Sequence, residues 1–320
     1  MLQTRAAIIR QVRSFFYERN YLELDTPLLS QDLIPESCLD VFKTQRLFPR
    51  GSKKESYPLW LIPSPEIWMK KIIARHGVNI FQICKCFRNG ESEGRLHNFE
   101  FTMLEYYTME ADYMDSLALT EELFGFLEKN LPRRHRGAHK NLSPPFERVT
   151  AAQAFERHAG FDLFAAAEKE GAMEEQARRL GLDPPPGMTT AQLYDLIFIH
   201  AVEPELKSKS PIALLDYPAF VPCLAKKSHN GKTAERWELY YDGIELANCF
   251  SEETDPQKVK EFFLSEEAAR ERAFLEKHNV DHDYQKIFEN FPRSSGAAMG
   301  IDRLIMALCG ISDIDAVLIK

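Results

Sequence analysis

The chain opens with apolar residues at helical spacing. Across residues 5–19 they recur every three or four positions, which predicts an amphipathic helix with one buried face. Residues 21–24 then predict a short strand. Pro27 ends that strand, because proline has no N–H group to donate to a neighbouring strand.

The next segment predicts a loop, a strand and a helix. Residues 44–57 are polar and irregular, so we expect a loop there, followed by a short strand over 59–62. Ser64 and Pro65 predict the start of a helix, with serine as its cap and proline at its first position. Gly77 predicts its end.

The rest of the pattern predicts strands and helices without regular βαβ alternation. Residues 80–87 and 99–107 predict two antiparallel strands joined by a long charged loop. The remaining predicted elements are a helix over 112–130, a mostly helical segment over 149–207, strands over 211–215, 236–242 and 244–250, a helix over 256–278, and a strand from 295 that runs into a helix. We therefore predict an α+β fold, an antiparallel sheet flanked by helices, in one domain over residues 1–320 with a helical insertion at about 149–207.

Composition and charge limit the class of protein. The chain has 320 residues, of which 44% are hydrophobic and 28% charged, as in a globular protein with a sizeable core. No apolar run reaches the roughly 18 residues of a membrane span, and no signal-peptide pattern is present, so we expect a cytoplasmic protein without a membrane partner. The net charge of −8 suits nucleic acid poorly as a main partner.

Two clusters allow alternative interpretations. Cys84 and Cys86 could form a metal or redox pair, but their spacing favours two side chains on one face of a buried strand. The basic run at residues 133–136 could dock an acidic partner, whereas an exposed loop is the simpler interpretation.

The predicted strand over 99–107 carries unusual chemistry on one face. Phe101, Glu105 and Tyr107 share that face, because side chains two positions apart point the same way along a strand. They would suit a ligand with a flat ring at one end and an ammonium group at the other, although polar residues on an edge strand are the alternative. Arg88, in the preceding loop, has the planar fork that suits a phosphate.

Two further segments carry candidate chemistry near the C-terminus. Glu245 and Glu252 could hold Mg²⁺ against phosphates, but a regular strand would point them to opposite faces. One shared site would require a bulge, or a position for Glu252 beyond the strand; two surface carboxylates are the alternative. Small residues from Gly296 to Gly300 allow a ligand to approach the backbone, and Arg303 could cover an aromatic ring.

Jointly, these segments resemble the motifs of class II aminoacyl-tRNA synthetases. The helix, strand and proline over residues 5–27 resemble motif 1, the strand–loop–strand over 81–107 resembles motif 2, and the segment 295–309 with its Asp-Arg resembles motif 3. Within the class, Ser-Pro-Glu at 64–66 and Glu-Leu-Ala-Asn at 245–248 resemble the lysine subgroup. The resemblance covers nearly the whole chain.

The resemblance implies a role for each matching residue. It implies ATP binding by Arg88, Asn89, Gly90, Glu91, His97, Asn98, Phe101, Glu245, Leu246, Gly300 and Arg303. It implies amino acid binding by Ser64, Pro65, Glu66, Glu105, Tyr107, Asn248, Glu252 and Ala298. Mg²⁺ would be held by Glu245 and Glu252, and Arg88 and Arg303 would neutralise phosphate charge in catalysis. The motif 2 loop is one residue longer than usual, so either Glu91 or Glu93 takes the usual glutamate position; we favour Glu91.

A shorter group within the class is the nearest match. Lysyl-tRNA synthetases carry an N-terminal anticodon-binding domain, and motif 1 begins here near residue 5, so we expect no such domain. The elongation factor P–lysine ligases also lack it. They activate (R)-β-lysine and transfer it to a lysine side chain of elongation factor P. Their motif 3 has alanine where lysyl-tRNA synthetases have glycine, as this chain does at Ala298.

The resemblance therefore implies a ligase that uses ATP and Mg²⁺ and acts on lysine or (R)-β-lysine. Its acceptor would be elongation factor P, and tRNA is not expected as a partner. The alternatives are a stand-alone enzyme that charges tRNA, a non-catalytic paralogue that only binds an amino acid, and synthesis of a small amide. Because motif 1 builds dimers in this class, the resemblance also implies a homodimer.

Overall fold

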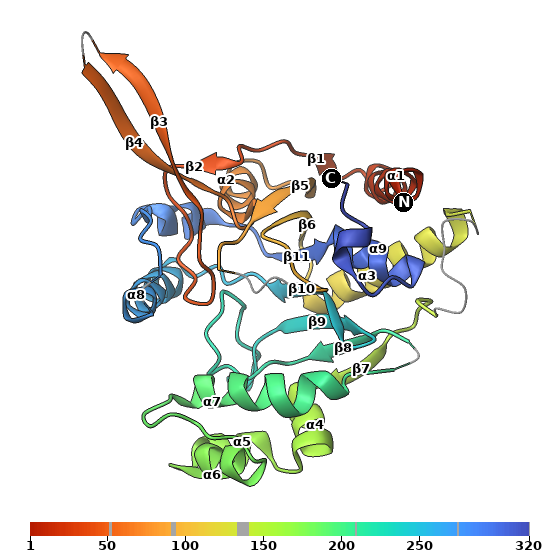
Figure 1. Ribbon diagram of the computed structural model, residues 1–320, viewed down its shortest axis with the longest axis vertical. Helices are drawn as coiled ribbons and strands as arrows, with labels where there is room; N and C mark the ends of the chain where they lie inside the picture. Colours follow the sequence, from red (N-terminus) through yellow and green to blue (C-terminus); the bar gives the residue numbers. More distant parts are fainter. Residues whose placement is uncertain (51–52, 91–93, 133–140, 209, 274, 320) are drawn as a thin grey trace.

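The computed structural model describes residues 1–50, 53–90, 94–132, 141–208, 210–273 and 275–319. Its centre is a sheet whose strands, in spatial order, are β1 (Leu22–Glu23), β5 (Ile80–Phe87), β6 (Glu100–Met109), β11 (Ser294–Gly300), β10 (Ile244–Ser251), β9 (Arg236–Tyr241), β8 (Ile212–Leu215) and β7 (Glu147–Thr150) (Figure 1). Neighbouring strands are antiparallel except for the pairs β1–β5 and β7–β8. The predicted α+β class, with helices beside a mostly antiparallel sheet, is confirmed.

Helices cover both faces of this sheet. One layer consists of α1 (Leu2–Tyr17), α3 (Tyr113–Asn130) and α9 (Ile301–Cys309), and the other contains α2 (Glu66–His76), α8 (Pro256–Arg272) and the 3-10 helix η5 (Tyr284–Asn290). Leu104 and Tyr106 belong to the core of the first layer, whereas Tyr107 belongs to that of the second. Strand β6 therefore points alternate side chains into two cores, as a period of two requires.

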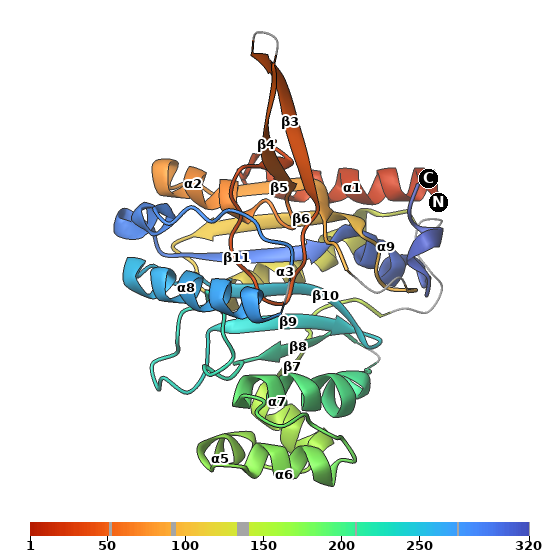
Figure 2. The same ribbon diagram turned by 60° about the vertical axis from the view of Figure 1, so that its left-hand side comes forward.

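The segment between β7 and β8 is helical. It contains α4 (Ala151–Ala154), the π-helix η2 (Phe155–Ala159), α5 (Leu163–Glu168), α6 (Ala172–Arg179), α7 (Thr190–Ile197), the π-helix η3 (Phe198–Val202) and the 3-10 helix η4 (Glu203–Glu205). These helices lie beyond β7 and β8, at one end of the sheet (Figure 2). The Tyr194 ring stacks on those of Phe155 and Phe198, with centroids 5.0 and 5.7 Å apart, so the segment has a core of its own.

The predicted loop over residues 44–57 is wrong. β3 (Lys43–Arg50) and β4 (Lys53–Leu61) form an antiparallel hairpin that joins β2 (Leu29–Ser30) in a separate three-stranded sheet. The hairpin projects from the body of the molecule (Figures 1 and 2). Most of its described side chains are exposed or half-buried, so its sequence lacks the apolar alternation by which strands are predicted.

Two helix boundaries differ from the prediction. α2 begins at Glu66 and Pro65 is its N-cap residue, so proline is not at the first helical position; Ser64 Oγ still accepts a hydrogen bond from the Glu66 N–H (3.1 Å). α8 ends at Arg272 rather than near 278. The last helical turn, η6 (Ile314–Ala316), lies near the C-terminus. In the described ranges, no helix combines the length and apolarity needed to span a bilayer.

Candidate active site

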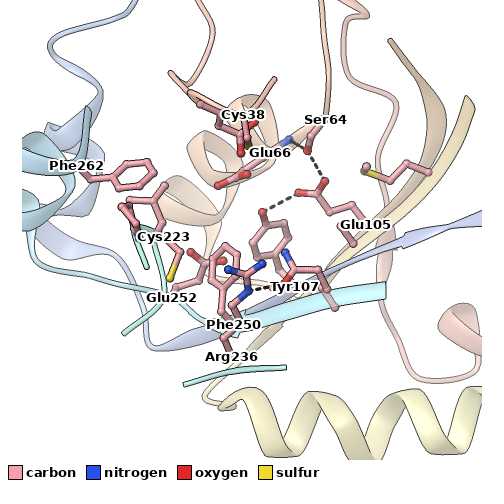
Figure 3. A pocket seen from close by; sticks show the side chains of 18 of the residues that line it. Cys38, Ser64, Glu66, Glu105, Tyr107, Cys223, Arg236, Phe250, Glu252 and Phe262 are labelled. Atoms are coloured by element: carbon pink, nitrogen blue, oxygen red, sulfur yellow. Dashed lines mark hydrogen bonds between the residues drawn. The ribbon is translucent and has the colours of Figure 1, made fainter. Parts of the chain in front are cut away.

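Two pockets lie side by side where β6, β10 and β11 face the loop after β2. One, which we call the acidic pocket, has a volume of about 200 Å³ and is lined by Ser64, Glu66, Glu105, Tyr107 and Glu252 among others (Figure 3). The other, the Phe101 pocket, has a volume of about 400 Å³. The lining residues common to both, which we call the shared wall, are Glu36, Cys38, Arg88, Met103, Arg236, Asn248 and Ala298.

Strand β6 supplies side chains to both pockets from one face. Phe101 lines the Phe101 pocket, Glu105 and Tyr107 line the acidic pocket, and Met103 belongs to the shared wall. The structure therefore follows the predicted alternation, and places the aromatic ring and the carboxylate–phenol pair in separate pockets.

Glu105 is held by two neighbouring hydroxyl groups. Ser64 Oγ donates to its Oε2 (2.6 Å) and Tyr107 Oη donates to its Oε1 (2.7 Å) (Figure 3). The side chain is buried, and burial together with the charge of Glu66 raises the pKa of Glu105 to about 8. A cationic ligand group would reverse this effect by stabilising the charged carboxylate.

Lys70 is a buried cation that was not predicted from the sequence motifs. Its Nζ lies 2.5 Å from Glu66 Oε1 and 2.7 Å from Glu252 Oε2, and its side chain is 0% exposed. Burial alone would lower the pKa of Lys70. The charges of Glu252 and Glu66 outweigh burial and raise the pKa above its usual value, so the lysine stays protonated. The pair could have been predicted from the sequence, because Lys70 follows Glu66 by four residues on α2 and side chains at this spacing meet on a helix.

Carboxylates outnumber cations in the acidic pocket. Glu36, Glu66, Glu105, Glu252 and Glu266 line it, whereas its described lining contains two arginines, with Lys70 directly behind. Burial raises the pKa of Glu36 and of Glu252 to about 7. Glu252 Oε1 is buried without a hydrogen bond to any described residue. Such a pocket favours a ligand that carries positive charge.

The glycine at position 296 is required by the shape of this pocket. A Cβ atom there would lie 2.4 Å from Tyr107 Cε1 and 2.5 Å from Glu252 Oε1, too close for any side chain. Ala298 lies two residues further along β11 and belongs to the shared wall. It pairs with Glu105 of β6 on one side and with Asn248 of β10 on the other.

The loop after β2 brings Glu36 and Cys38 to the shared wall. Arg270 of α8 donates to the Glu36 carbonyl oxygen (2.6 Å) and to that of Leu39, and the Ser37 N–H donates to Glu266 (2.6 Å). Nothing in the composition of this loop marks it as part of a site, so its role could not be predicted from the sequence.

Arginines and an aromatic ring characterise the Phe101 pocket. The Arg88 guanidinium carbon lies 5.2 Å from the centre of the Phe101 ring. Arg303 Nη1 donates to the Glu245 carbonyl oxygen (3.0 Å) and lies 3.4 Å from Glu245 Oε2. His97, Asn98, Leu246 and Gly300 also line this pocket. A flat ring beside two cations suits an aromatic ligand that carries phosphate.

Three expected residues lie outside these pocket walls. Pro65 is the N-cap of α2, the Asn89 N–H donates to the Asp40 carbonyl oxygen (3.0 Å), and Gly90 lies next to it. Glu91, with its alternative Glu93, lies outside the described residues, as does the basic run at 133–136.

Glu245 and Glu252 do not line the same pocket. The pairing of β9 with β10 shifts between Glu245 and Ala247, and Glu252 follows the last residue of β10, so both a bulge and a position beyond the strand occur. Glu245 faces Arg303 in the Phe101 pocket, whereas Glu252 pairs with Lys70 in the acidic pocket. In the described part of the chain, no three His, Cys, Asp or Glu side chains are grouped to hold a metal ion.

Cys84 and Cys86 lie side by side on β5, with sulfur atoms 3.9 Å apart.

Comparison with known families shows which protein family has this architecture. A family model described as tRNA synthetases class II (D, K and N) matches residues 1–319. The chain belongs to the class II tRNA synthetase family. The resemblance on which the sequence analysis relied is thereby confirmed.

Relatives within the class II synthetase family share a common name. A protein of Histophilus somni (strain 2336) named elongation factor P–(R)-β-lysine ligase is 37% identical over 319 residues, which cover 99% of this chain and 93% of the relative. Proteins of the same name from Vibrio atlanticus and Haemophilus influenzae (strain PittGG) are 36% and 35% identical, over 99% and 95% of this chain and 94% and 90% of theirs.

A buried ion pair links the three class II synthetase motifs. Asp302, in motif 3, accepts hydrogen bonds from the Thr102 N–H in motif 2 (2.7 Å) and from Arg5 in motif 1 (2.5 Å). Arg5 also donates to Thr102 Oγ1 (2.7 Å). Because Arg303 is the next residue, this network fixes its helix against the strand that carries Phe101.

Proposed function

We propose that the protein is a ligase that activates (R)-β-lysine with ATP as an aminoacyl-adenylate and transfers it to a lysine side chain of elongation factor P. The names of the relatives support the amino acid and the acceptor. The observation that carries the proposal is the acidic pocket, with five carboxylates in its wall, joined through the shared wall to a pocket lined by Phe101 and Arg303. A lysine isomer carries two ammonium groups, and ATP carries a flat ring and phosphates.

Each pocket would hold one substrate. In the acidic pocket, Glu105, Tyr107 and Glu252 would bind one ammonium group and Glu66 the other, with Ser64, Pro65, Asn248 and Ala298 shaping the site. A carboxylate left without an ammonium partner costs affinity, so substrates that lack the second amine would be rejected. In the Phe101 pocket, the adenine would stack between Phe101 and Arg303.

The remaining ATP-binding residues keep the roles that the resemblance implies. Arg88 would bind the α-phosphate; the others are Asn89, Gly90, Glu91, His97, Asn98, Leu246 and Gly300. Mg²⁺ usually binds one or two protein carboxylates together with substrate phosphates, and Glu245 fits that description better than Glu252, which pairs with Lys70. When bound, the ion would neutralise phosphate charge.

The chemistry needs no protein nucleophile. A carboxylate oxygen of the amino acid attacks the α-phosphorus of ATP, the bond to the bridging oxygen breaks, and pyrophosphate leaves. The neutral amine of the acceptor lysine then attacks the carbonyl carbon of the adenylate, loses a proton, and displaces AMP. The protein's residues supply position and charge, with Arg88 and Arg303 opposing the negative charge of the phosphates.

Exchange of radiolabelled pyrophosphate into ATP tests the activation step. We expect exchange with (R)-β-lysine, weaker exchange with α-lysine and (S)-β-lysine, and little with ornithine. Failure of every lysine isomer to support exchange would contradict the proposal and favour a protein that only binds an amino acid.

We further propose that the chain acts as a cytoplasmic homodimer and forms one catalytic domain, with residues 149–207 as a helical insertion. Strand β1 lies at the edge of the central sheet, and Leu22, Leu28 and Leu29 expose apolar side chains near it. An exposed strand edge beside apolar side chains supports an interface there. Light scattering during gel filtration should give twice the mass of the chain, and Leu22→Asp should give the single mass.

A further inference from the structure

We propose that Arg236 binds the carboxylate of the amino acid at the shared wall and so holds the attacking oxygen against the α-phosphate of the nucleotide. This deepens the proposed function and rests on it. Arg236 is the first residue of β9 and lies outside the three motifs on which the resemblance was based. Its side chain lines the acidic pocket, as do those of Phe250 and Glu252 (Figure 3).

The position of Arg236 is the first argument. The amino acid and the nucleotide occupy adjacent pockets, so their reacting groups must meet at the shared wall. Both groups, a carboxylate and a phosphate, are anions, and the meeting point has to supply cations. In the described shared wall the cations are Arg88 and Arg236. Since Arg88 is expected to bind the phosphate, Arg236 remains for the carboxylate.

The packing of Arg236 holds its guanidinium in a fixed plane. Glu238 Oε1 accepts from its Nη2 (2.5 Å), and Glu238 Oε2 accepts from the hydroxyl groups of Tyr217 (2.5 Å) and Tyr240 (2.6 Å). The guanidinium carbon lies 4.5 Å from the centre of the Tyr217 ring. Glu238, itself held by two phenols, therefore fixes the guanidinium at the shared wall.

One edge of the guanidinium is left for a ligand. Arg236 Nε donates to Asn248 Oδ1 (3.0 Å) and Nη2 donates to Glu238, whereas Nη1 makes no hydrogen bond to any described residue. The side chain is 18% exposed, so it is open to the pocket. Nη1 can only donate hydrogen bonds, so a ligand that binds it must offer an acceptor, such as a carboxylate oxygen.

Arg236 also fixes the orientation of Asn248. An arginine can only donate, so the amide oxygen of Asn248 must face Nε, and the amide nitrogen must point elsewhere. Asn248 also belongs to the shared wall, so its amide group is a second donor there besides Arg236. In a pocket otherwise rich in carboxylates, this pair of donors is where a ligand's anionic end is stabilised.

Calorimetric titration with two ligands tests this role. (R)-β-lysine and (S)-1,4-diaminopentane carry the same two ammonium groups in the same spatial arrangement, but only the first has a carboxylate. We expect Arg236→Gln to weaken (R)-β-lysine at least about tenfold, the loss of one charged hydrogen bond, and to leave the diamine within about twofold. Arg236→Lys, which keeps the charge and can still pair with Glu238, should recover part of the affinity.

The controls separate this inference from other causes. Arg148→Gln removes an arginine that pairs with Glu121 (3.0 Å) and lines neither pocket, so it should change neither affinity. Equal weakening of both ligands in the two Arg236 variants would show a structural role and overturn the inference, as would unchanged (R)-β-lysine affinity. If the unmodified protein binds neither ligand, the proposed function itself fails.

Discussion

At the scale of single residues, the acidic pocket is a set of carboxylates held close together at a cost. Glu66 and Glu252 share one buried lysine, and Glu105 is held by two hydroxyl groups. Like charges in a buried site raise one another's pKa values, and a ligand that brings positive charge relieves this. The unliganded pocket therefore favours a ligand that brings positive charge, as the proposed substrate does.

Replacing Glu252 tests this reasoning. Glu252→Gln removes one ammonium partner, so KM for (R)-β-lysine in pyrophosphate exchange should rise about tenfold to 100-fold, with KM for ATP nearly unchanged. Lys70 keeps its ion pair with Glu66, so the variant should remain folded. The matched control is Glu253→Gln, because Glu253 pairs with the half-exposed Lys258 and lines neither pocket. Similar kinetics in both variants would contradict the account.

The pH dependence follows from the same carboxylates. In the folded protein the pKa of Glu105 is raised to about 8, and those of Glu36 and Glu252 to about 7, mainly by burial. Between about pH 4.5 and 8 the folded state therefore binds more protons than the unfolded state, and stability without ligand should fall as pH rises. We expect the melting temperature to fall over this range, and the stabilisation by (R)-β-lysine to grow. A ligand effect independent of pH would contradict the assignment.

Ala298 is expected to select between lysine isomers. It lies in the shared wall between Glu105 and Asn248, so its methyl group would border the bound amino acid. Ala298→Gly should shift the ratio of exchange rates toward α-lysine by about tenfold, since one methyl group in a pocket is worth about 1–3 kcal/mol. An unchanged ratio would show that selectivity lies elsewhere.

At the scale of elements, the chain divides into a body that contains the site and a hairpin that does not. None of the described side chains of β3 or β4 lines either pocket. Arg46 and Tyr57 are paired across the hairpin, so an Asn-Gly turn can join them in place of residues 47–56. This variant should keep pyrophosphate exchange within about twofold, because a surface change away from the core alters stability little. A loss of exchange would show that the hairpin supports the site.

The elements also show what the sequence could and could not predict. β5 and β6 were predicted closely because their apolar residues face buried surfaces, whereas β3 and β4 were missed because most of their described side chains are not buried. The motifs pointed to the residues of both pockets. They could not show that Glu245 and Glu252 line different pockets, since that depends on strand pairing. Nor could they find Lys70 or Arg236, whose surroundings come from distant parts of the chain.

At the scale of the whole molecule, the fold brings two pockets to one wall. Motif 1 supplies Arg5, motif 2 supplies Thr102 and motif 3 supplies Asp302 to the network that fixes the helix of Arg303. The amino acid would approach this wall from one side and the nucleotide from the other. Chemistry that joins a carboxylate to a phosphate then needs only that both be held there.

The transfer reaction tests the central claim most directly. The protein would be incubated with ATP, Mg²⁺ and (R)-β-lysine together with either elongation factor P or lysine tRNA, and each acceptor analysed by mass spectrometry. We predict that elongation factor P gains the mass of one β-lysyl group on a lysine side chain, that omission of ATP abolishes the gain, and that the tRNA stays unchanged. Aminoacylated tRNA beside unmodified elongation factor P would contradict the account.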